Sequence, residues 1–220
     1  MIINQTIMAT IPNSFDFFNL AGMATDISKL KPTVFIDRDG VINRNRTEHV
    51  LSWKDFQFED GAIEGLRLLH EAGFQIVVVT NQGVIGRGLA TEAQIKRLHE
   101  LMIAEIELHG CQIRAVYCCP HHPDAGCFCR KPKPGMLLQA AAQFNLQLSK
   151  SWVVGDHLTD IQTGLAAGSK PVLVLTGRGQ ASFKKWQETK ILHDSIPGLK
   201  VENNLLDAAK YIISLEQVII

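Results

Sequence analysis

Residues 34–40 read Val-Phe-Ile-Asp-Arg-Asp-Gly, and this stretch decides the fold class. Its three apolar residues are typical of a strand buried inside a parallel sheet. Strand side chains alternate between faces, so Asp37 and Asp39 are expected to point the same way, with Arg38 turned aside. Gly40 then allows the backbone to turn sharply. Two carboxylates this close repel unless a cation separates them or one is protonated, so the pair predicts a nucleophile, a proton shuttle and a divalent metal such as Mg²⁺.

Apolar runs and helical patterns alternate along the chain after residue 33. Further strands are expected at residues 76–80, 113–117, 152–155 and 172–175. Helices are expected at residues 62–71, between residues 91 and 110, and at 134–144, 159–167 and 205–215. The alternation predicts an α/β fold, a doubly wound parallel sheet with helices on both faces. Ligands bind at the carboxyl ends of the strands in such sheets, so the polar residues that follow each strand are the site candidates.

Length and composition exclude several classes of protein. The chain has 220 residues, 46% hydrophobic and 20% charged, with 22 basic and 22 acidic side chains. This balance predicts no broad basic surface for nucleic acid. No apolar run approaches the roughly 18–20 residues of a membrane span. The first basic residue is Lys29, so the basic start of a secretory signal is missing. We therefore expect a cytoplasmic protein, acting as a monomer without nucleic-acid or membrane partners.

The first 30 residues fit poorly with the alternating pattern. The apolar side chains at residues 15–20 could form a short helix or remain unpacked, and Met23 could be the true start. We expect residues 1–30 to be a poorly ordered leader. Residues 31–220 are expected to form one domain, with a metal-binding loop at residues 118–130.

Polar residues follow the predicted strands where a site is expected. Thr80-Asn81-Gln82-Gly83 combines a hydroxyl, two amides and a glycine-opened turn, which can donate hydrogen bonds to phosphate oxygens. Asp156 offers another carboxylate to a metal, and Asp160 can orient it from the next turn. Lys131, in the proline-stiffened segment 129–134, suits a fixed positive charge facing a phosphate. Each of these segments alone is more often a turn, a helix cap or a solvated loop. The prediction of a site rests on all of them occurring together, in order along the chain.

Cysteine and histidine cluster in one loop of the chain. The spacing Cys-x-His-x₅-Cys-x-Cys is formed by Cys119, His121, Cys127 and Cys129. Three thiolates and one imidazole make a closed tetrahedral Zn²⁺ site, which leaves no open position for chemistry and is therefore structural. The metal would stiffen the loop that carries Arg130 and Lys131. Cys118 and His122 are alternative ligands by spacing, and Cys111 is expected to be a simple buried thiol.

The ordered set of an acidic pair, Thr-Asn, Lys-Pro and Gly-Asp-x-x-x-Asp resembles the haloacid dehalogenase (HAD) superfamily of phosphotransferases. The resemblance implies that Asp37 attacks phosphorus to form an aspartyl-phosphate. Asp39 would protonate the leaving oxygen and then deprotonate the attacking water. Thr80 and Lys131 would stabilise the transferring phosphoryl group. Mg²⁺ would be held by Asp37, Asp156 and the main-chain carbonyl of Asp39. The fold would be HAD-like and lack a large cap domain.

The metal-loop sequence narrows this resemblance. Residues 118–123, Cys-Cys-Pro-His-His-Pro, and 127–137, Cys-Phe-Cys-Arg-Lys-Pro-Lys-Pro-Gly-Met-Leu, resemble the D-glycero-D-manno-heptose-1,7-bisphosphate 7-phosphatases. The similarity spans roughly residues 33–179. It implies hydrolysis of the C7 phosphate of a small phosphorylated sugar, in the biosynthesis of the nucleotide-activated heptose of lipopolysaccharide or surface-layer glycans. It also implies substrate contacts from Asn45, Arg46, Thr47, Glu48, Asn81, Gln82, Gly83, Arg130 and His157.

Two departures from the family pattern concern the substrate. His157 stands where the family often has Lys, so a contact with the distal phosphate would be weaker or pH-dependent. Residues 82–86, Gln-Gly-Val-Ile-Gly, replace the usual Gln-Ser-Gly-Ile-Ala. The short metal loop also occurs in the related histidinol-phosphate phosphatases, although Arg87-Gly88 resembles the heptose enzymes. A histidinol-phosphate phosphatase, or one for another small sugar phosphate, is the alternative enzyme. A non-catalytic zinc-stabilised binding module is the alternative outside enzymes.

Overall fold

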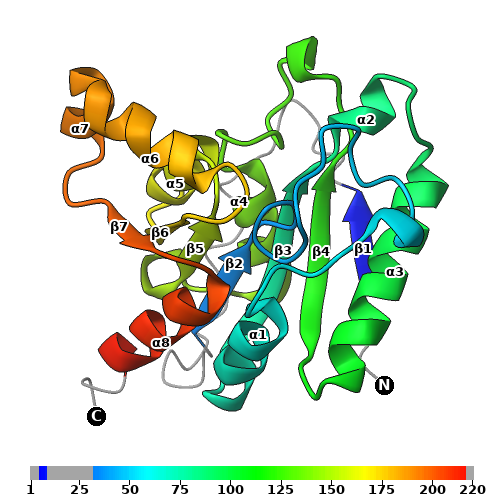
Figure 1. The fold of residues 1–220 in the computed structure, drawn as a ribbon, viewed down its shortest axis with the longest axis horizontal. Helices are drawn as coiled ribbons and strands as arrows, with labels where there is room; N and C mark the ends of the chain where they lie inside the picture. The colour runs from blue at the N-terminus through cyan, green and yellow to red at the C-terminus, as the bar shows by residue number, and fades with distance from the viewer. Residues whose placement is uncertain (1–4, 9–31, 217–220) are drawn as a thin grey trace.

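The computed structural model describes residues 5–8 and 32–216. Within these residues seven strands form one sheet, and every neighbouring pair is parallel, in the order β1-β4-β3-β2-β5-β6-β7 (Figure 1). The strands are β1 (Gln5–Met8), β2 (Thr33–Ile36), β3 (Gln75–Asn81), β4 (Ile113–Cys119), β5 (Trp152–Gly155), β6 (Lys170–Val174) and β7 (Lys200–Glu202). All five predicted strands are present, and β1 and β7 are additions.

Helices cover both faces of the sheet. They are α1 (Ala62–Glu71), α2 (Gly83–Gly86), α3 (Glu92–Leu108), α4 (Gly135–Phe144), α5 (Leu158–Ala166), α6 (Gly179–Glu188), α7 (Lys190–Ser195) and α8 (Leu205–Glu216). Short 3₁₀ helices occur at η3 (Trp53–Asp55), η4 (Pro123–Ala125) and η5 (Leu148–Lys150). The predicted doubly wound α/β fold is therefore confirmed. Among residues 32–216 there is no separate cap domain, and no described helix is long and apolar enough to cross a membrane.

The sheet separates two main layers of the core. Ile36 on β2 and Val78 on β3 pack with α1, α3 and α8 on one face. Phe35 and Val77, which alternate with them, pack with α4 on the other face. This alternation follows from the period-two geometry of a strand, and a strand covered on both faces is apolar throughout. The predicted near-continuous apolar runs are therefore explained by burial on both sides.

Strand β1 lies within the segment that we expected to be a poorly ordered leader. It is an edge strand parallel to β4, with Met8 opposite Cys118. No sequence signal predicted this strand, because residues 5–8 show no clear alternation of polar and apolar side chains, and pairing at a sheet edge uses main-chain groups that every sequence carries. The rest of the expected leader, including the apolar residues 15–20 and Met23, lies outside the described residues.

Strand β2 lies between β3 and β5 in the sheet. Its continuation is fixed beyond the last paired residue, because the main-chain N–H of Asp37 donates to the carbonyl of Val154 at 2.9 Å. The chain turns at Gly40, whose φ is +88°, a conformation that favours glycine. The predicted acidic pair thus begins at the carboxyl end of a central strand, where the loops from β3 and β5 meet it.

Candidate active site and metal cluster

A cavity of about 370 Å³ opens at the carboxyl ends of the strands. It is lined by twelve of the predicted catalytic, magnesium-binding and substrate-binding residues: Asp37, Asp39, Asn45, Arg46, Thr80, Asn81, Gln82, Gly83, Arg130, Lys131, Asp156 and His157. Thr47 and Glu48, which were also predicted to contact substrate, are exposed and do not line it. Sequence position placed them beside Asn45 and Arg46, but the loop turns their side chains toward solvent.

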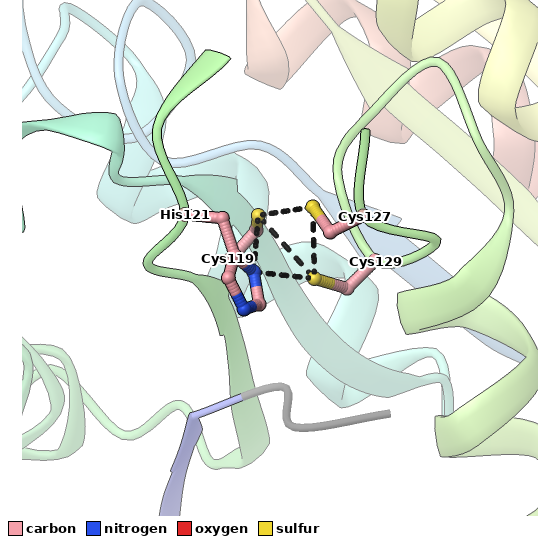
Figure 2. Close-up of side chains that lie close together, drawn as sticks. All are labelled: Cys119, His121, Cys127 and Cys129. Atoms are coloured by element: carbon pink, nitrogen blue, oxygen red, sulfur yellow. Dashed lines mark hydrogen bonds between the residues drawn. The ribbon is translucent and has the colours of Figure 1, made fainter. Parts of the chain in front are cut away.

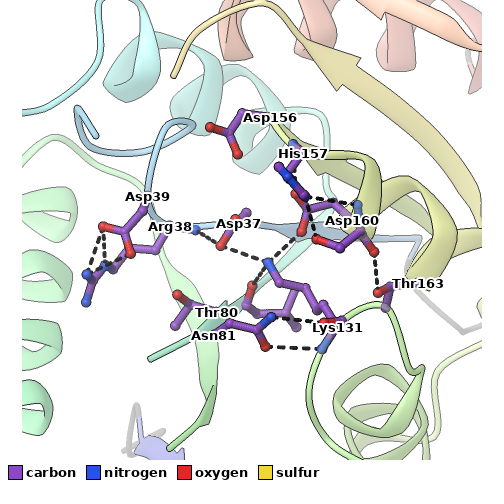
Figure 3. Close-up of polar contacts among 12 residues, drawn as sticks. Asp37, Arg38, Asp39, Thr80, Asn81, Lys131, Asp156, His157, Asp160 and Thr163 are labelled. Atoms are coloured by element: carbon purple, nitrogen blue, oxygen red, sulfur yellow. Dashed lines mark hydrogen bonds and ion pairs between the residues drawn. The ribbon is translucent and has the colours of Figure 1, made fainter. Parts of the chain in front are cut away.

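Lys131 is buried beneath the predicted nucleophile. Its Nζ lies 2.9 Å from Oδ1 of Asp37 and 2.6 Å from Oδ1 of Asp160, and it donates to the carbonyl of Val79 at 3.0 Å (Figure 3). Burial alone would lower the pKa of Lys131, but the two carboxylates raise it above its usual value. Lys131 therefore carries a permanent positive charge at a fixed position in the site.

The main chain of Lys131 is held by Asn81. The N–H of Lys131 donates to Oδ1 of Asn81 at 3.1 Å, and Nδ2 of Asn81 donates back to the carbonyl of Lys131 at 3.2 Å (Figure 3). The amide of Asn81 is thus occupied on both its acceptor and its donor side. We predicted that this residue contacts substrate, and it lines the cavity; its amide also joins the end of β3 to the lysine loop.

Asp37 and Asp156 form an acidic pocket that fits a divalent cation. Their carboxylate oxygens and those of Asp160 lie within 4.8 Å of one another. Burial raises the pKa of Asp37 to about 7, although the charge of Lys131 opposes the shift. Burial raises the pKa of Asp156 to about 8, and repulsion from Asp37 and Asp160 adds to the effect. Buried carboxylates that repel in this way are stabilised by a hard cation with oxygen ligands. Both oxygens of Asp160 have partners, Oδ1 with Lys131 and Oδ2 with the main-chain N–H of His157, and Asp160 does not line the cavity. Asp37 and Asp156 do line it, so they are the side chains that best fit Mg²⁺.

Close packing fixes the carboxylate of Asp156. Its Oδ2 accepts from Nδ2 of Asn45 at 2.8 Å and from the main-chain N–H of Arg178 at 2.7 Å. Gly40 and Gly177 both have positive φ and pass so near that a Cβ on either would collide with this carboxylate. Two turns that need glycine therefore form the walls around the predicted metal ligand.

Asp39 has a different environment from Asp37. Arg38, predicted only to turn aside, folds back and donates from Nη2 to both carboxylate oxygens of Asp39, at 2.8 and 2.9 Å. Asn43 and Gln82 donate to the same carboxylate, at 3.0 and 2.8 Å. Although burial opposes it, the charge and hydrogen bonds of Arg38 hold the pKa of Asp39 below its usual value. The side chain of Asp39 remains 27% exposed toward the cavity.

Gln82 connects Asp39 to Thr80. Its Nε2 lies 2.8 Å from Oδ2 of Asp39 and 2.8 Å from Oγ1 of Thr80. This amide nitrogen is occupied within the protein, so Gln82 orients two predicted catalytic groups. His157 likewise has a structural contact, because its Nδ1 accepts from the N–H of Thr159 at 3.3 Å and caps α5. Its desolvation lowers the pKa of His157.

The predicted metal loop brings its four side chains together (Figure 2). The sulfurs of Cys119, Cys127 and Cys129 are separated by 3.4, 3.5 and 3.6 Å, and Nδ1 of His121 lies 3.2 Å from Cys129. In a tetrahedral zinc site with Zn–S bonds of about 2.3 Å, the sulfurs would lie about 3.8 Å apart. A hydrogen bond from Cys129 lowers the pKa of Cys119, against the effect of burial, which favours the thiolate form that binds metal. The donor set and spacing fit Zn²⁺.

The two alternative ligands do not join this cluster. Cys118 is buried in a separate apolar cluster with Val84 and Ile95, because neighbouring strand residues face opposite sides. His122 caps η4, where its Nδ1 accepts from the N–H of Asp124 at 3.3 Å. Cys111 is a buried thiol, as predicted, and donates to the carbonyl of Leu66 at 3.4 Å.

The cavity is also lined by polar side chains that were not predicted as site residues. Arg178, directly after the Thr176-Gly177 turn, lines it together with Arg87 and His49. Nη2 of Arg87 lies 3.2 Å from Nε2 of His49, so the loop after β2 contacts the turn after α2. The search for polar residues after each apolar run could have found Arg178, because it follows β6. His49 carried no local signal.

The chain is similar in sequence to a hydrolase family model and to named phosphatases. A sequence model of the HAD-hydrolase-like family matches residues 128–198. A Neisseria meningitidis serogroup A protein named D-glycero-beta-D-manno-heptose-1,7-bisphosphate 7-phosphatase is 37% identical over 180 residues, covering 82% of this chain and 94% of the relative. A protein of the same name from Yersinia pestis is 45% identical over 156 residues, covering 67% and 82%.

Solved structures agree with the sequence relatives. The D,D-heptose 1,7-bisphosphate phosphatase of B. bronchiseptica, solved with magnesium and phosphate, matches with a TM-score of 0.76 and 31% identity, over 84% of this chain and 99% of that one. The corresponding enzyme of Burkholderia thailandensis matches with a TM-score of 0.62 and 31% identity, over the same shares. Both the sequence and the fold are therefore shared along nearly the whole length of these proteins.

Proposed function

The chain belongs to the D-glycero-β-D-manno-heptose-1,7-bisphosphate 7-phosphatases, within the HAD-like hydrolases, and we propose that it hydrolyses the C7 phosphate of that sugar bisphosphate. It is a phosphoric monoester hydrolase by family. The observation that carries the proposal is the contact between Lys131 and Asp37 at the floor of a cavity that Asp156 also lines. A carboxylate nucleophile, a fixed cation and a metal-binding acid are the groups that phosphoryl transfer requires.

Asp37 is suited to attack phosphorus. The Arg38 main-chain N–H and Lys131 Nζ both contact its Oδ1, at 2.7 and 2.9 Å, so Oδ2 is the oxygen that can form the new bond. As that bond forms, the bond from phosphorus to the sugar oxygen breaks, and the sugar oxygen takes a proton from Asp39. Water then attacks phosphorus, its proton passes to Asp39, and the carboxylate of Asp37 is released.

Charge neutralisation comes from Lys131, Thr80 and the metal. The hydroxyl of Thr80 and the ammonium of Lys131 both line the cavity, where they can contact phosphoryl oxygens. We propose that Asp37, Asp156 and the main-chain carbonyl of Asp39 hold Mg²⁺. When bound, Mg²⁺ neutralises the buried carboxylates and the charge on the phosphoryl group.

The second phosphate of the substrate needs its own cation, and we propose Arg130. Its Nη1 is buried and makes no hydrogen bond within the described residues. A buried, unpaired guanidinium nitrogen costs free energy, unless a ligand accepts its hydrogen bond. Arg46, Arg87 and Arg178 add positive charge around the same cavity. These cations favour a bisphosphate over histidinol phosphate, whose amine they would repel.

We propose that Zn²⁺ at Cys119, His121, Cys127 and Cys129 is structural. Cys129 is buried and directly precedes Arg130 and Lys131, so fixing its sulfur fixes the start of the segment that delivers both cations. Cys119 ends β4, which anchors the other side of the cluster to the sheet. The metal would therefore support the site without contacting substrate.

Substrate turnover tests the proposal directly. Phosphate release should be measured with both anomers of D-glycero-D-manno-heptose 1,7-bisphosphate and with histidinol phosphate, using ³¹P NMR to identify the phosphate that remains. We expect release from C7 and retention at C1. A clear preference for histidinol phosphate would overturn the substrate assignment. We further propose a cytoplasmic monomer, and light scattering coupled to size-exclusion chromatography tests the oligomeric state.

A further inference from the structure

Arg38, between the two proposed catalytic aspartates, has partners on two sides. Arg38 is buried, with 1% of its surface exposed. On one side Nε and Nη2 contact the carboxylate of Asp39, at 3.2 Å and 2.8 Å to Oδ1. On the other side Nη1 lies 3.0 Å from Nε2 of His99, a fully buried residue of α3. A chain of contacts thus runs from the helix, through the arginine, to the cavity wall.

The direction of these hydrogen bonds follows from the chemistry of arginine. A guanidinium has only donors, so Nε2 of His99 must accept, and the proton of this imidazole is on Nδ1. Nδ1 has no hydrogen-bond partner within the described residues. His99 therefore buries one polar atom, Nδ1, without a hydrogen bond among the described residues. An apolar residue at this position would not have this cost. The contact with Arg38 is the one described interaction of the His99 ring that offsets this cost.

The groups around Asp39 identify the form in which it is held. Arg38, Asn43 and Gln82 all donate to its carboxylate, through nitrogen atoms. A protonated carboxyl would direct its own O–H toward donors, so this arrangement fits the proton-accepting form. In the proposed reaction that form acts in the second step, when water hydrolyses the aspartyl-phosphate on Asp37.

We propose that His99 is a positioning residue, which through Arg38 aligns Asp39 as the base for hydrolysis of the aspartyl-phosphate. The inference rests on the proposed aspartyl-phosphate mechanism but not on the heptose substrate. The water oxygen bonds to phosphorus, the bond from phosphorus to Asp37 breaks, and the water proton passes to Asp39. His99 fixes the plane of the guanidinium, and the guanidinium fixes both carboxylate oxygens. Misplacing a reacting group by about 1 Å can cost roughly 100-fold in rate.

The two steps can be separated with p-nitrophenyl phosphate. Its leaving group departs without a proton, so the first step does not depend on Asp39, whereas the second step does. In His99→Leu we expect kcat to fall about 10-fold or more, with kcat/KM within about 2-fold of the wild type. Stopped-flow mixing should then show a burst of about one p-nitrophenol per active site, because the aspartyl-phosphate accumulates.

Two variants control for a purely structural effect. His99→Gln can place an amide oxygen where Nε2 accepts from Arg38, and it should restore kcat toward the wild-type value. Met102→Leu changes a fully buried apolar residue of the same helix and should change neither kcat nor the burst. If His99→Leu does not fold, Arg38→Lys, which keeps the charge but lacks the fork, should show the same burst.

Three outcomes would overturn the inference. The first is an unchanged kcat in His99→Leu. The second is a parallel loss of kcat and kcat/KM without a burst, as expected when a core defect lowers the active fraction. The third is a His99→Gln variant no better than His99→Leu. All three outcomes are measured with an aryl phosphate. A lack of activity on heptose bisphosphate would therefore refute the substrate assignment, and the test of His99 would remain valid.

Discussion

The side chain of Asn81 and the main chain of Lys131 are joined by two hydrogen bonds, although 50 residues separate them in sequence. The amide oxygen accepts one bond and the amide nitrogen donates the other, so the side chain pairs with Lys131 as a main-chain peptide group pairs in a β-sheet. The link holds the lysine loop against β3, at the strand end next to the nucleophile. The position of Lys131, the proposed catalytic cation, therefore depends on the side chain of Asn81.

Asn81→Ala should lower kcat by about 10-fold with little change in KM, because two hydrogen bonds of about 1 kcal/mol each no longer fix Lys131. Steady-state kinetics with the sugar bisphosphate measures this split. Asn203→Ala, which removes an exposed amide whose hydrogen bond within the described residues is to Asp207, is the matched control and should be silent. A rise in KM at constant kcat would instead show that Asn81 binds substrate.

Asp37→Asn should abolish turnover without unfolding the protein. The amide cannot attack phosphorus, while Lys131 keeps its contact with Asp160 at 2.6 Å. Removing one of three repelling carboxylates should also keep the melting temperature at or above the wild-type value in metal-free buffer. Phosphate release and thermal unfolding measure the two effects. Activity near the wild-type level would remove Asp37 from the role of nucleophile.

Purified protein should contain one zinc per chain, and Cys127→Ser should lose it. We expect a lower melting temperature and reduced activity, because the segment before Arg130 and Lys131 loses its anchor. Elemental analysis and calorimetry measure both. Cys118→Ala, which alters a buried thiol outside the cluster, should keep the zinc. Zinc-free protein after purification without chelators would refute the site.

Arg130→Ala should lower kcat/KM for the sugar bisphosphate by about 10-fold or more, the worth of a charged hydrogen bond of roughly 1.5–3 kcal/mol. A small monophosphate has no second phosphate to contact and should be affected less. Lys131→Ala should reduce both activities strongly, because it faces the transferring group. Equal losses on the two substrates in Arg130→Ala would remove this residue from distal recognition.

Protein without bound Mg²⁺, but with its zinc, should lose stability as the pH rises from about 4 to about 8. The pKa values of Asp37 and Asp156 are raised to about 7 and about 8, so over this range the folded state binds more protons than the unfolded state. The stabilisation from these two carboxyls is therefore fully present below their pKa in the unfolded chain, and it is lost as the pH rises through their folded-state pKa values of about 7 and about 8. Saturating Mg²⁺ should reduce the loss. Thermal unfolding across this range measures the effect, and a slope unchanged by Asp156→Asn would contradict it.

Much of the fold could be predicted because its signals are local. Strand β2 and the acidic residues after it are adjacent in sequence, and strand ends in a parallel sheet meet at one edge. The metal-loop spacing is equally local, and the four side chains are together in the structure. These patterns depend on neighbouring residues, whose geometry the backbone fixes.

The remaining site features depend on contacts between distant segments. No sequence pattern shows that Arg38 is buried against His99, because the packing of α3 against the sheet decides that contact. The occupied amides of Asn81 and Gln82 have the same origin. Thr47 and Glu48 were assigned by analogy along a loop, and only the path of that loop shows that they face solvent.

The main-chain hydrogen bond from Asp37 to Val154 makes the proposed nucleophile part of the central sheet. The bond extends the pairing of β2 with β5, in the middle of the sheet, by one residue. We therefore expect the backbone at Asp37 to open together with the whole domain, as one cooperative event. A variant weakened elsewhere in the core should therefore lose activity in proportion to its unfolded fraction, and the molecules that remain folded should be fully competent.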